Sequence, residues 1–426
     1  MDTLSVDSSL TDNTLVSTVA VPRRLEKYFH SLKMVASYDV PLRANRSILS
    51  IPFVSNILPL AWLTGTDVHV ETLDRTYVEA MTAIKHEFNL MYPRGEFKTK
   101  ITSDDLVENQ TDSQETACLF SGGVDSTYSL ISNISLKPRL IMYSGVQHYQ
   151  LNPSYTKHQQ LVKTTYSAFA KRQGLPINFI ETNIISTLND SRISHDFHKI
   201  LRETGLWLAL QFPLVLLGLP APLSFGRFNR LLIAASVDPK HDYDKYPHSS
   251  QPRIDEKFAW ANVKVTHDGY IHRFKKTHLI KEFLNENRID LNVCNRPPLN
   301  KLNCSACEKC YRTIAPLVLE GVDPNVCGFS VDKSTFKSMK RMLERKKTDA
   351  LVVDSFWKEL QALVKPDMES DRFDSKDLFL WLKNLDMDSV RKRRNYYQDI
   401  FNVLPYPLSL SFDKFFKLVR KPRVQK

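Results

Sequence analysis

The chain has 426 residues, of which 42% are apolar and 25% are charged, and its formal net charge is +11. This length exceeds one ordinary hydrophobic core, and the composition argues against a globally disordered protein. Six cysteines in so long a chain argue against a disulfide scaffold, and the start MDTLSVDSSL lacks the basic residues of a signal peptide, so we expect a cytoplasmic protein.

The first part of the chain divides into a tail and an α/β extension. Residues 1–20 are rich in Ser, Thr and Asp, and predict a flexible tail. Residues 21–112 predict an extension in which DVHVETL alternates as a strand and Asp74 caps the helix DRTYVEAMTAIKHEFNLMY. The segment EFKTKIT predicts a second strand, and the polar residues 103–115 predict a linker.

Residues 113–327 repeat a strand–helix pattern. Strands are expected in TACLF, PRLIMYSG, PINFIETN and NRLLIAASV, with helices between them. Such alternation is typical of an α/β fold with a doubly wound parallel sheet. The long apolar runs at 48–63 and 205–225 are interrupted by proline and polar residues, so we expect no membrane span. Residues 328–426 predict a C-terminal helical domain.

The segment SGGVDST, residues 121–127, joins the first of these strands to its helix. Glycines let backbone N–H groups approach phosphate oxygens, and the helix start adds unpaired donors and a positive dipole end. Asp125 can hold a divalent cation or brace the loop. The lysine of a GxxxxGK[ST] loop is missing, which argues against γ-phosphate transfer. The alternative is a tight strand-to-helix turn.

SGGVDST resembles the SGGxDS signature of the PP-loop ATP pyrophosphatases. The resemblance implies a PP-loop fold that binds ATP with Mg²⁺, cleaves it between the α and β phosphates, and adenylates an acceptor. It assigns the nucleotide to Ser121, Gly122, Gly123, Val124, Asp125, Ser126 and Thr127. The segment HRFKKTHLIKEF is similar to a later family segment, LxKxEI, which aligns Lys276 with the family lysine and places His278 where the family has an acid. The resemblance therefore makes Asp125 and Lys276 catalytic candidates.

Four of the six cysteines form a C-x9-C-x2-C-x2-C cluster: Cys294, Cys304, Cys307 and Cys310. A closed set of four thiolates favours tetrahedral Zn²⁺, with an iron–sulfur cluster as the alternative. Lys301, Lys309 and Arg312 lie nearby in the sequence and would offset the thiolate charge. We expect a structural zinc, and we expect the remaining Cys118 and Cys327 to be packing residues.

A glycine loop followed by such a cluster resembles the 7-cyano-7-deazaguanine synthase branch of the PP-loop family. This resemblance covers roughly residues 116–315 and implies amide or nitrile formation from a carboxylate, with ATP and ammonia. The chain departs from it in its long extensions and in one extra residue between the first two cysteines. We therefore expect a synthase-like relative acting on a carboxylate or amide acceptor.

Weaker signals follow the fourth predicted strand. The loop there offers five residues that could contact substrate: His248, Ser249, Ser250, Arg253 and Asp255. His267 and Asp268 are expected in a turn, and RKRR at 391–394 on a solvated helix face.

Two further functions stay open. Residues 328–426 carry 22 Lys and Arg against 14 Asp and Glu, which would suit a tRNA-modifying PP-loop enzyme if this region held nucleic acid. The other is a non-catalytic nucleotide-binding module of a defence or biosynthetic system. The partner we expect is a small-molecule or modified-base acceptor, without a membrane, and a homodimer is compatible with the sequence.

Overall fold

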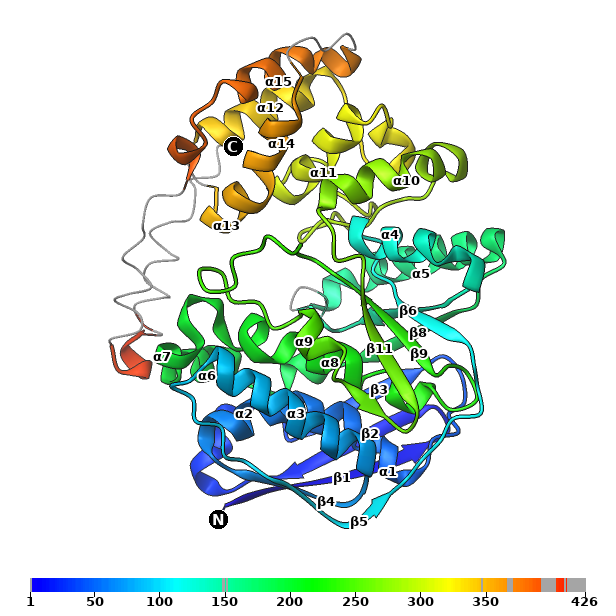
Figure 1. Cartoon of the computed structure of the whole chain (residues 1–426), viewed down its shortest axis with the longest axis vertical. Helices are drawn as coiled ribbons and strands as arrows, with labels where there is room; N and C mark the ends of the chain where they lie inside the picture. The colour runs from blue at the N-terminus through cyan, green and yellow to red at the C-terminus, as the bar shows by residue number, and fades with distance from the viewer. Residues whose placement is uncertain are drawn as a thin grey trace.

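The computed structural model describes residues 2–147, 150, 152–345, 348–365, 371–391, 404–409 and 411. Within these residues it is an α/β structure built on one eleven-stranded sheet, with strand order β10-β11-β9-β6-β7-β8-β3-β2-β1-β4-β5 (Figure 1). Most neighbouring strands are parallel. The α/β class and the mostly parallel sheet predicted from the sequence are therefore confirmed.

The parallel core consists of the four predicted strands and one more. In chain order these are β6 (Thr116–Leu119), β7 (Arg139–Ser144), β8 (Ile177–Thr182), β9 (Arg230–Ala234) and β11 (Val263–Asp268). The five strands lie side by side in the order β11-β9-β6-β7-β8, and each adjacent pair is parallel. A short strand, β10 (Ala259–Trp260), pairs antiparallel with β11 at the sheet edge. All four residues of β6 are buried, as expected for a central strand covered on both faces.

The prediction of a flexible tail is wrong for residues 2–20. They contain two strands, β1 (Thr3–Thr11) and β2 (Thr14–Ala20), that pair antiparallel. The segment is polar in composition, but Leu4 and Val6 alternate with exposed residues and are buried. Ser8 and Ser17 are also buried, and their hydroxyls lie 2.8 Å apart. The alternation of buried and exposed residues therefore predicts strands here, although the composition of the segment suggests disorder.

The N-terminal strands continue the central sheet. Strand β3 (Lys33–Tyr38) pairs antiparallel with both β2 and β8. Strand β4 (Asp67–Asp74) and helix α3 (Arg75–Met91) match the prediction, and the Asp74 carboxylate accepts from the Tyr77 N–H at 2.8 Å. Strand β5 (Ile101–Val107) begins later than predicted and occupies the first part of the expected linker.

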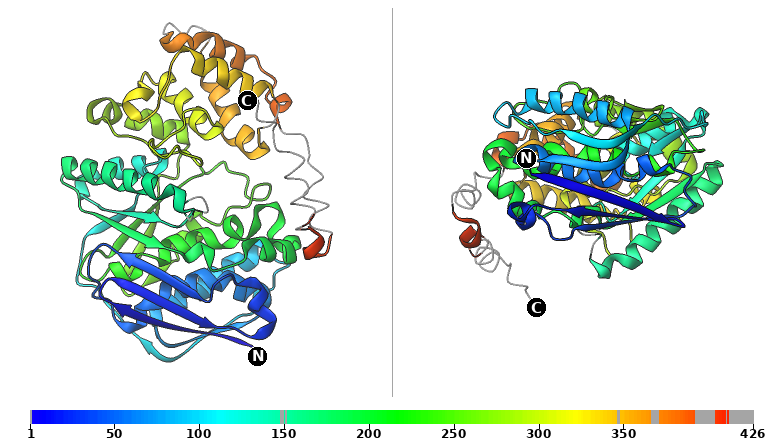
Figure 2. Two further views of the ribbon diagram at one scale, coloured as in Figure 1. Left: turned by 180° about the vertical axis from the view of Figure 1, so that it is seen from behind. Right: turned by 90° about the horizontal axis from the view of Figure 1, so that it is seen from below.

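Helices cover both faces of the sheet (Figure 2). Ala117 and Leu119 of β6 join one core cluster with α2 (Ile51–Thr64) and α8 (Phe212–Gly218). Cys118 and Phe120 join the other with four helices: α4 (Val124–Ser132), α5 (Thr156–Gln173), α10 (Arg273–Asn287) and α11 (Glu308–Leu319). Both apolar runs of the sequence thus contribute buried helices, and none of the helices in the described ranges is long and apolar enough to cross a membrane.

The C-terminal helices share the second core cluster and do not form a core of their own. They are α12 (Lys333–Glu344), α13 (Ala350–Val352), a π-helical turn at Val353–Trp357, α14 (Lys358–Leu363) and α15 (Lys376–Lys383). They cap α10 and α11 at the end of the molecule opposite the N-terminal strands (Figure 1). Of the RKRR segment, Arg391 pairs with Asp354 and Asp388, while residues 392–394 lie outside the described residues.

Asp354 ties these helices to the loop that follows β9. Its carboxylate accepts from Tyr246 Oη at 2.7 Å and from Lys245 Nζ at 3.0 Å, both in that loop, and it pairs with Lys358 at 3.2 Å and with Arg391. Burial alone would raise the pKa of Asp354, but hydrogen bonds from Tyr246, Lys245 and Lys358 lower it from 3.8 to about 2.

Acid is therefore expected to weaken this attachment in a narrow pH range. Because folding lowers the pKa, the stabilisation is complete above the unfolded pKa of 3.8 and is lost as the pH falls toward 2. Fluorescence of the buried Trp357, followed from pH 5 to pH 2, should show a transition in the wild type. Asp354→Asn should show no such transition, because it weakens the attachment at every pH. Asp377→Asn, at an exposed acid on α15, serves as control and should keep the wild-type curve.

Candidate functional site

The glycine loop lies at the carboxyl end of β6, where open parallel sheets bind ligands. Gly123 is the N-cap of α4, so the loop leads directly into the unpaired N–H groups of the helix start. Ser126 organises the loop: its hydroxyl accepts from the Ser121 N–H at 3.2 Å, donates to the Gly123 carbonyl at 3.2 Å and lies 3.1 Å from Ser121 Oγ. The predicted strand–turn–helix arrangement of SGGVDST is present.

Gly122 carries the sharp turn of the loop. Its φ is +74°, a conformation that favours glycine, and a Cβ here would overlap the Tyr166 hydroxyl. That hydroxyl donates to the Asp290 carbonyl at 2.7 Å, and the Asn292 N–H donates to the Gly122 carbonyl at 2.7 Å. The turn is thus held against the segment that leads to Cys294.

We expect Gly122→Ala to destabilise the protein more than Gly174→Ala does. Gly174 ends α5 at φ +63° with open space around it, so alanine there adds only backbone strain, about 1 kcal/mol. At Gly122 the same strain is joined by displacement of the buried Tyr166, for a total of about 3 kcal/mol. Chemical denaturation of both variants measures the difference. Equal losses would contradict the contact with Tyr166.

Asp125 lies in the first turn of α4 between two cations of α10. Arg273 pairs with both of its oxygens, and Lys276 Nζ lies 3.0 Å from Oδ1. Burial alone would raise the pKa of Asp125, but these two charges hold it below its usual range. The Lys276 side chain is 1% exposed and also donates to the Ala235 carbonyl. Asp125 is therefore a part-buried ion-pair centre on a helix.

A cavity of about 890 Å³ opens above the loop. This volume falls within the range of about 300–1,000 Å³ that is usual for small-molecule sites. The wall next to the glycine loop carries Arg273, Lys309 and the Asn292 amide. The wall formed by β7, β8, α8 and the π-helical turn before α8 (Trp207–Gln211) is mainly apolar. The apolar and aromatic residues there are Met142, Tyr143, Phe179, Trp207, Phe212 and Leu216.

The predicted site residues divide into two groups. The cavity wall includes Ser121, Gly123, Val124, Asp125 and Ser126. Among the described residues it includes neither Gly122, which shapes the turn, nor Thr127, a fully buried residue of α4. Lys276 also lies behind the wall, next to Asp125. Its ammonium contacts the Asp125 carboxylate and the Ala235 carbonyl.

The cavity residues that were not assigned to the site from the sequence include two cations next to the glycine loop, Arg273 and Lys309. Arg273 lies three residues before Lys276, one helical turn away on the same face, and this spacing was the available signal. Lys309 lies between two cysteines and donates to Asn295 Oδ1 at 2.9 Å. Burial, with the nearby charges of Arg312 and Arg273, lowers the pKa of Lys309 to about 8. A bound anion would offset this crowding of positive charge.

Phe356, in the π-helical turn of the C-terminal helices, makes a cation–π contact with Arg273. Its ring centroid lies 4.8 Å from the Arg273 guanidinium and 4.3 Å from the Arg312 guanidinium. Arg312 in turn pairs with Glu308 at 3.5 Å. The C-terminal helices therefore help to orient a cation of the cavity wall.

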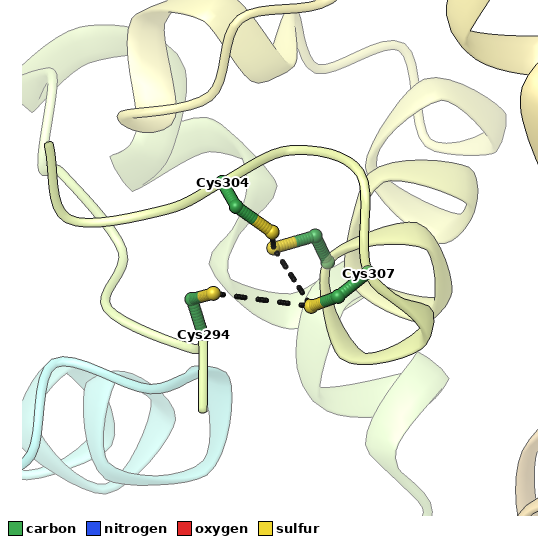
Figure 3. A group of neighbouring side chains, drawn as sticks. Cys294, Cys304 and Cys307 are labelled. Atoms are coloured by element: carbon green, nitrogen blue, oxygen red, sulfur yellow. Dashed lines mark hydrogen bonds between the residues drawn. The ribbon is translucent and has the colours of Figure 1, made fainter. Parts of the chain in front are cut away.

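The four predicted cysteines converge at the start of α11 (Figure 3). The Sγ atoms of Cys294 and Cys307 are 3.9 Å apart, those of Cys304 and Cys310 3.8 Å, and those of Cys307 and Cys310 3.5 Å. Zn–S bonds of about 2.3 Å place the sulfurs of a tetrahedral site about 3.8 Å apart. The set therefore fits a metal such as zinc.

Backbone donors support thiolate charge in this set. The Arg296 N–H points to Cys294 Sγ at 3.4 Å, and the Ala306 N–H to Cys304 Sγ at 3.5 Å. Hydrogen bonds within the set lower the pKa of Cys294 and raise the pKa of Cys310, so the thiols share their protons. Cys118 and Cys327 lie outside the set and are fully buried, as expected for packing residues.

The loop residues proposed as substrate contacts lie elsewhere. Ser249, Ser250 and Asp255 are buried, and the cavity wall formed by the described residues includes none of the five candidates, His248 and Arg253 among them. Ser250 Oγ donates to Asp255 at 2.6 Å, and His267 Nδ1 lies 2.7 Å from the same oxygen. His267 and Asp268 end strand β11, so their expected placement in a turn is wrong. Ser250, Asp255 and His267 form a buried polar cluster that anchors the loop.

Comparison of the chain with protein-family models, with curated proteins and with solved structures found no match. A function therefore has to be argued from the side chains around the cavity and from the sequence pattern of the glycine loop.

Proposed function

We propose that the chain is an ATP-dependent adenylating enzyme that releases pyrophosphate and activates a carboxylate or amide for attack by ammonia or another amine. The observation that carries this proposal is the glycine loop, which opens at the start of α4 into a cavity lined by Arg273 and Lys309. Backbone donors, a helix N-terminus and two cations suit a polyphosphate. The apolar opposite wall suits a nucleobase or an acceptor.

The proposed chemistry assigns the loop to the leaving pyrophosphate. The Gly123 N–H and the hydroxyls of Ser121 and Ser126 would bind its oxygens. Arg273 and Lys309 would stabilise the negative charge that develops on it as the acceptor oxygen attacks the α phosphorus. The loop has no lysine of the kind that serves γ-phosphate transfer, which supports cleavage between the α and β phosphates.

Mg²⁺ binding by Asp125 does not fit this arrangement. Both carboxylate oxygens already pair with Arg273 or Lys276. Asp125 and Asp190 are the acids among the described residues of the cavity wall. Asp125 is better suited to holding Arg273 in place, with Lys276 as a positioning residue behind it.

Exchange of labelled pyrophosphate into ATP tests the proposal without an amine. Carboxylate acceptors would be screened singly, and an active one should give exchange, followed by AMP and pyrophosphate when ammonium is added. Ser126→Ala should reduce the exchange at least about tenfold, since it removes a loop hydroxyl. Ser129→Ala is the matched control, because Ser129 lies one helical turn further along α4 and is fully buried.

The other outcomes decide between alternatives. ADP and phosphate as products would refute adenylation. Tight ATP binding without exchange for any acceptor would favour a non-catalytic nucleotide-binding module. A thiolating, tRNA-modifying enzyme would need a reactive cysteine outside the metal set, and the burial of Cys118 and Cys327 argues against it.

A further inference from the structure

A second group of potential metal ligands lies apart from the four cysteines. It consists of Asp238, His272 and Glu359, whose ligand atoms all lie within 4.8 Å of one another. Asp238 comes from the loop after β9, His272 is the N-cap of α10, and Glu359 lies on α14. His272 Nε2 lies 3.7 Å from Asp238 Oδ2 and is in direct contact with Glu359 Oε2. Three separate elements thus direct donors at one point.

The chemistry of the three donors suits a divalent cation. Two carboxylates supply negative charge, and burial lowers the pKa of His272, which keeps its ring neutral and able to coordinate. Burial and the neighbouring Asp238 carboxylate raise the pKa of Glu359 to about 7. Two carboxylates close together repel each other, and a cation between them would remove that repulsion.

The neighbouring cations leave room for such an ion. Arg273 and Lys276 of the same helix are engaged with Asp125. Lys240 is exposed on the loop that carries Asp238. Side-chain exposures of 13% for Asp238, 27% for His272 and 30% for Glu359 would let water complete the coordination.

The orientation of the His272 ring makes Nε2 the nitrogen that would coordinate the metal. Its Nδ1 faces the start of α10, 3.3 Å from the Phe274 amide nitrogen, so Nε2 is turned toward the two carboxylates. Coordination through Nε2 would place the ring proton on Nδ1 and end that long capping contact. A mixed nitrogen and oxygen set with three protein ligands is typical of Mn²⁺, Fe²⁺ or Zn²⁺.

We infer that Asp238, His272 and Glu359 bind a divalent transition-metal ion of this class. The site lies just outside the cavity, since Ser236 and Arg273, close neighbours of its ligands, belong to the cavity wall. The ion joins the C-terminal helices, through α14, to the loop after β9 and to the start of α10. It would thereby fasten the helix that supplies Arg273, and it does not depend on the function proposed above.

Mn²⁺ titration followed by electron paramagnetic resonance tests this site. The protein is loaded with one equivalent of zinc, which the four thiolates bind in preference to a nitrogen and oxygen site, and is used without nucleotide. The second site is then left open to Mn²⁺, which prefers carboxylate and imidazole ligands. About one Mn²⁺ per chain should bind, with a rise in the thermal unfolding temperature. Glu359→Gln and Asp238→Asn should each weaken binding at least about tenfold.

Glu320→Gln provides the matched control. Glu320 Oε2 also contacts a histidine, His278 Nδ1, at 2.7 Å. Its other neighbour is Lys281 Nζ at 3.6 Å, whereas metal binding would need a second carboxylate at that place. This variant should bind Mn²⁺ as the wild type does. If Glu359→Gln fails to fold, as judged by circular dichroism, Asp238→Asn decides. Absence of Mn²⁺ binding, or binding unchanged in a folded Asp238→Asn, would overturn the inference.

Discussion

Asp125→Ala is expected to abolish ATP turnover and also to lower the free energy of unfolding by about 3–5 kcal/mol. The stability loss follows from Lys276, whose nearly inaccessible ammonium would lose its carboxylate partner. Removing one member of a buried ion pair leaves an uncompensated charge. The loss of turnover follows from Arg273, which would lose the carboxylate that orients it in the cavity wall. A drop of at least about a hundredfold is expected.

The double variant Asp125→Ala/Lys276→Met separates the two effects. It removes both charges, so much of the lost stability, about 2 kcal/mol or more, should return. Turnover should stay low, because Arg273 remains without its partner. Denaturant unfolding and the exchange assay measure the two quantities on the same samples. Unchanged stability in Asp125→Ala, or restored turnover in the double variant, would contradict these roles.

Cys307→Ser is expected to release the bound metal and to destabilise the protein by more than about 3 kcal/mol, because metal binding free energy is also folding free energy. Cys307 is the N-cap of α11 and its Sγ is close to those of Cys294 and Cys310. Loss of the metal should also loosen Asn292, two residues before Cys294, and with it the Gly122 turn.

Elemental analysis and thermal unfolding check this expectation. Wild-type protein should carry about one zinc per chain in the cysteine set, and Cys307→Ser should carry less. Cys327→Ser is the matched control, since Cys327 is fully buried but outside the set. It should lose some stability while keeping the zinc. Iron with visible absorbance in the wild type would point to an iron–sulfur cluster instead.

Local patterns predicted the parts of the site that are close in sequence. The glycine loop, the strand before it and the helix after it follow from residues 116–132. The cysteine set was readable from its spacing alone. In both cases the chemistry of the residue types narrowed the possible structures, because few other arrangements use adjacent glycines or four clustered thiols.

Contacts between distant segments could not be predicted in this way. Arg273 pairs with Asp125 across 148 positions, and nothing near either residue indicates the other. The burial of Lys276 could not be predicted for the same reason, since it depends on how α10 packs against α4. The strands at 3–20 were missed because serine and threonine can occupy strand positions in a segment whose composition suggests disorder.

The pairing of β3 with β8 limits how the chain can be divided. It joins Ala36 to Thr182, Ser37 to Glu181 and Tyr38 to Ile180. Without the N-terminal strands, β8 would become an edge strand with unpaired amides and carbonyls, open to pairing with other chains. A fragment that starts at the glycine-loop region would expose this edge and tend to aggregate. The N-terminal strands β1–β5, which end at Val107, therefore act as an edge cover for the sheet that carries the cavity.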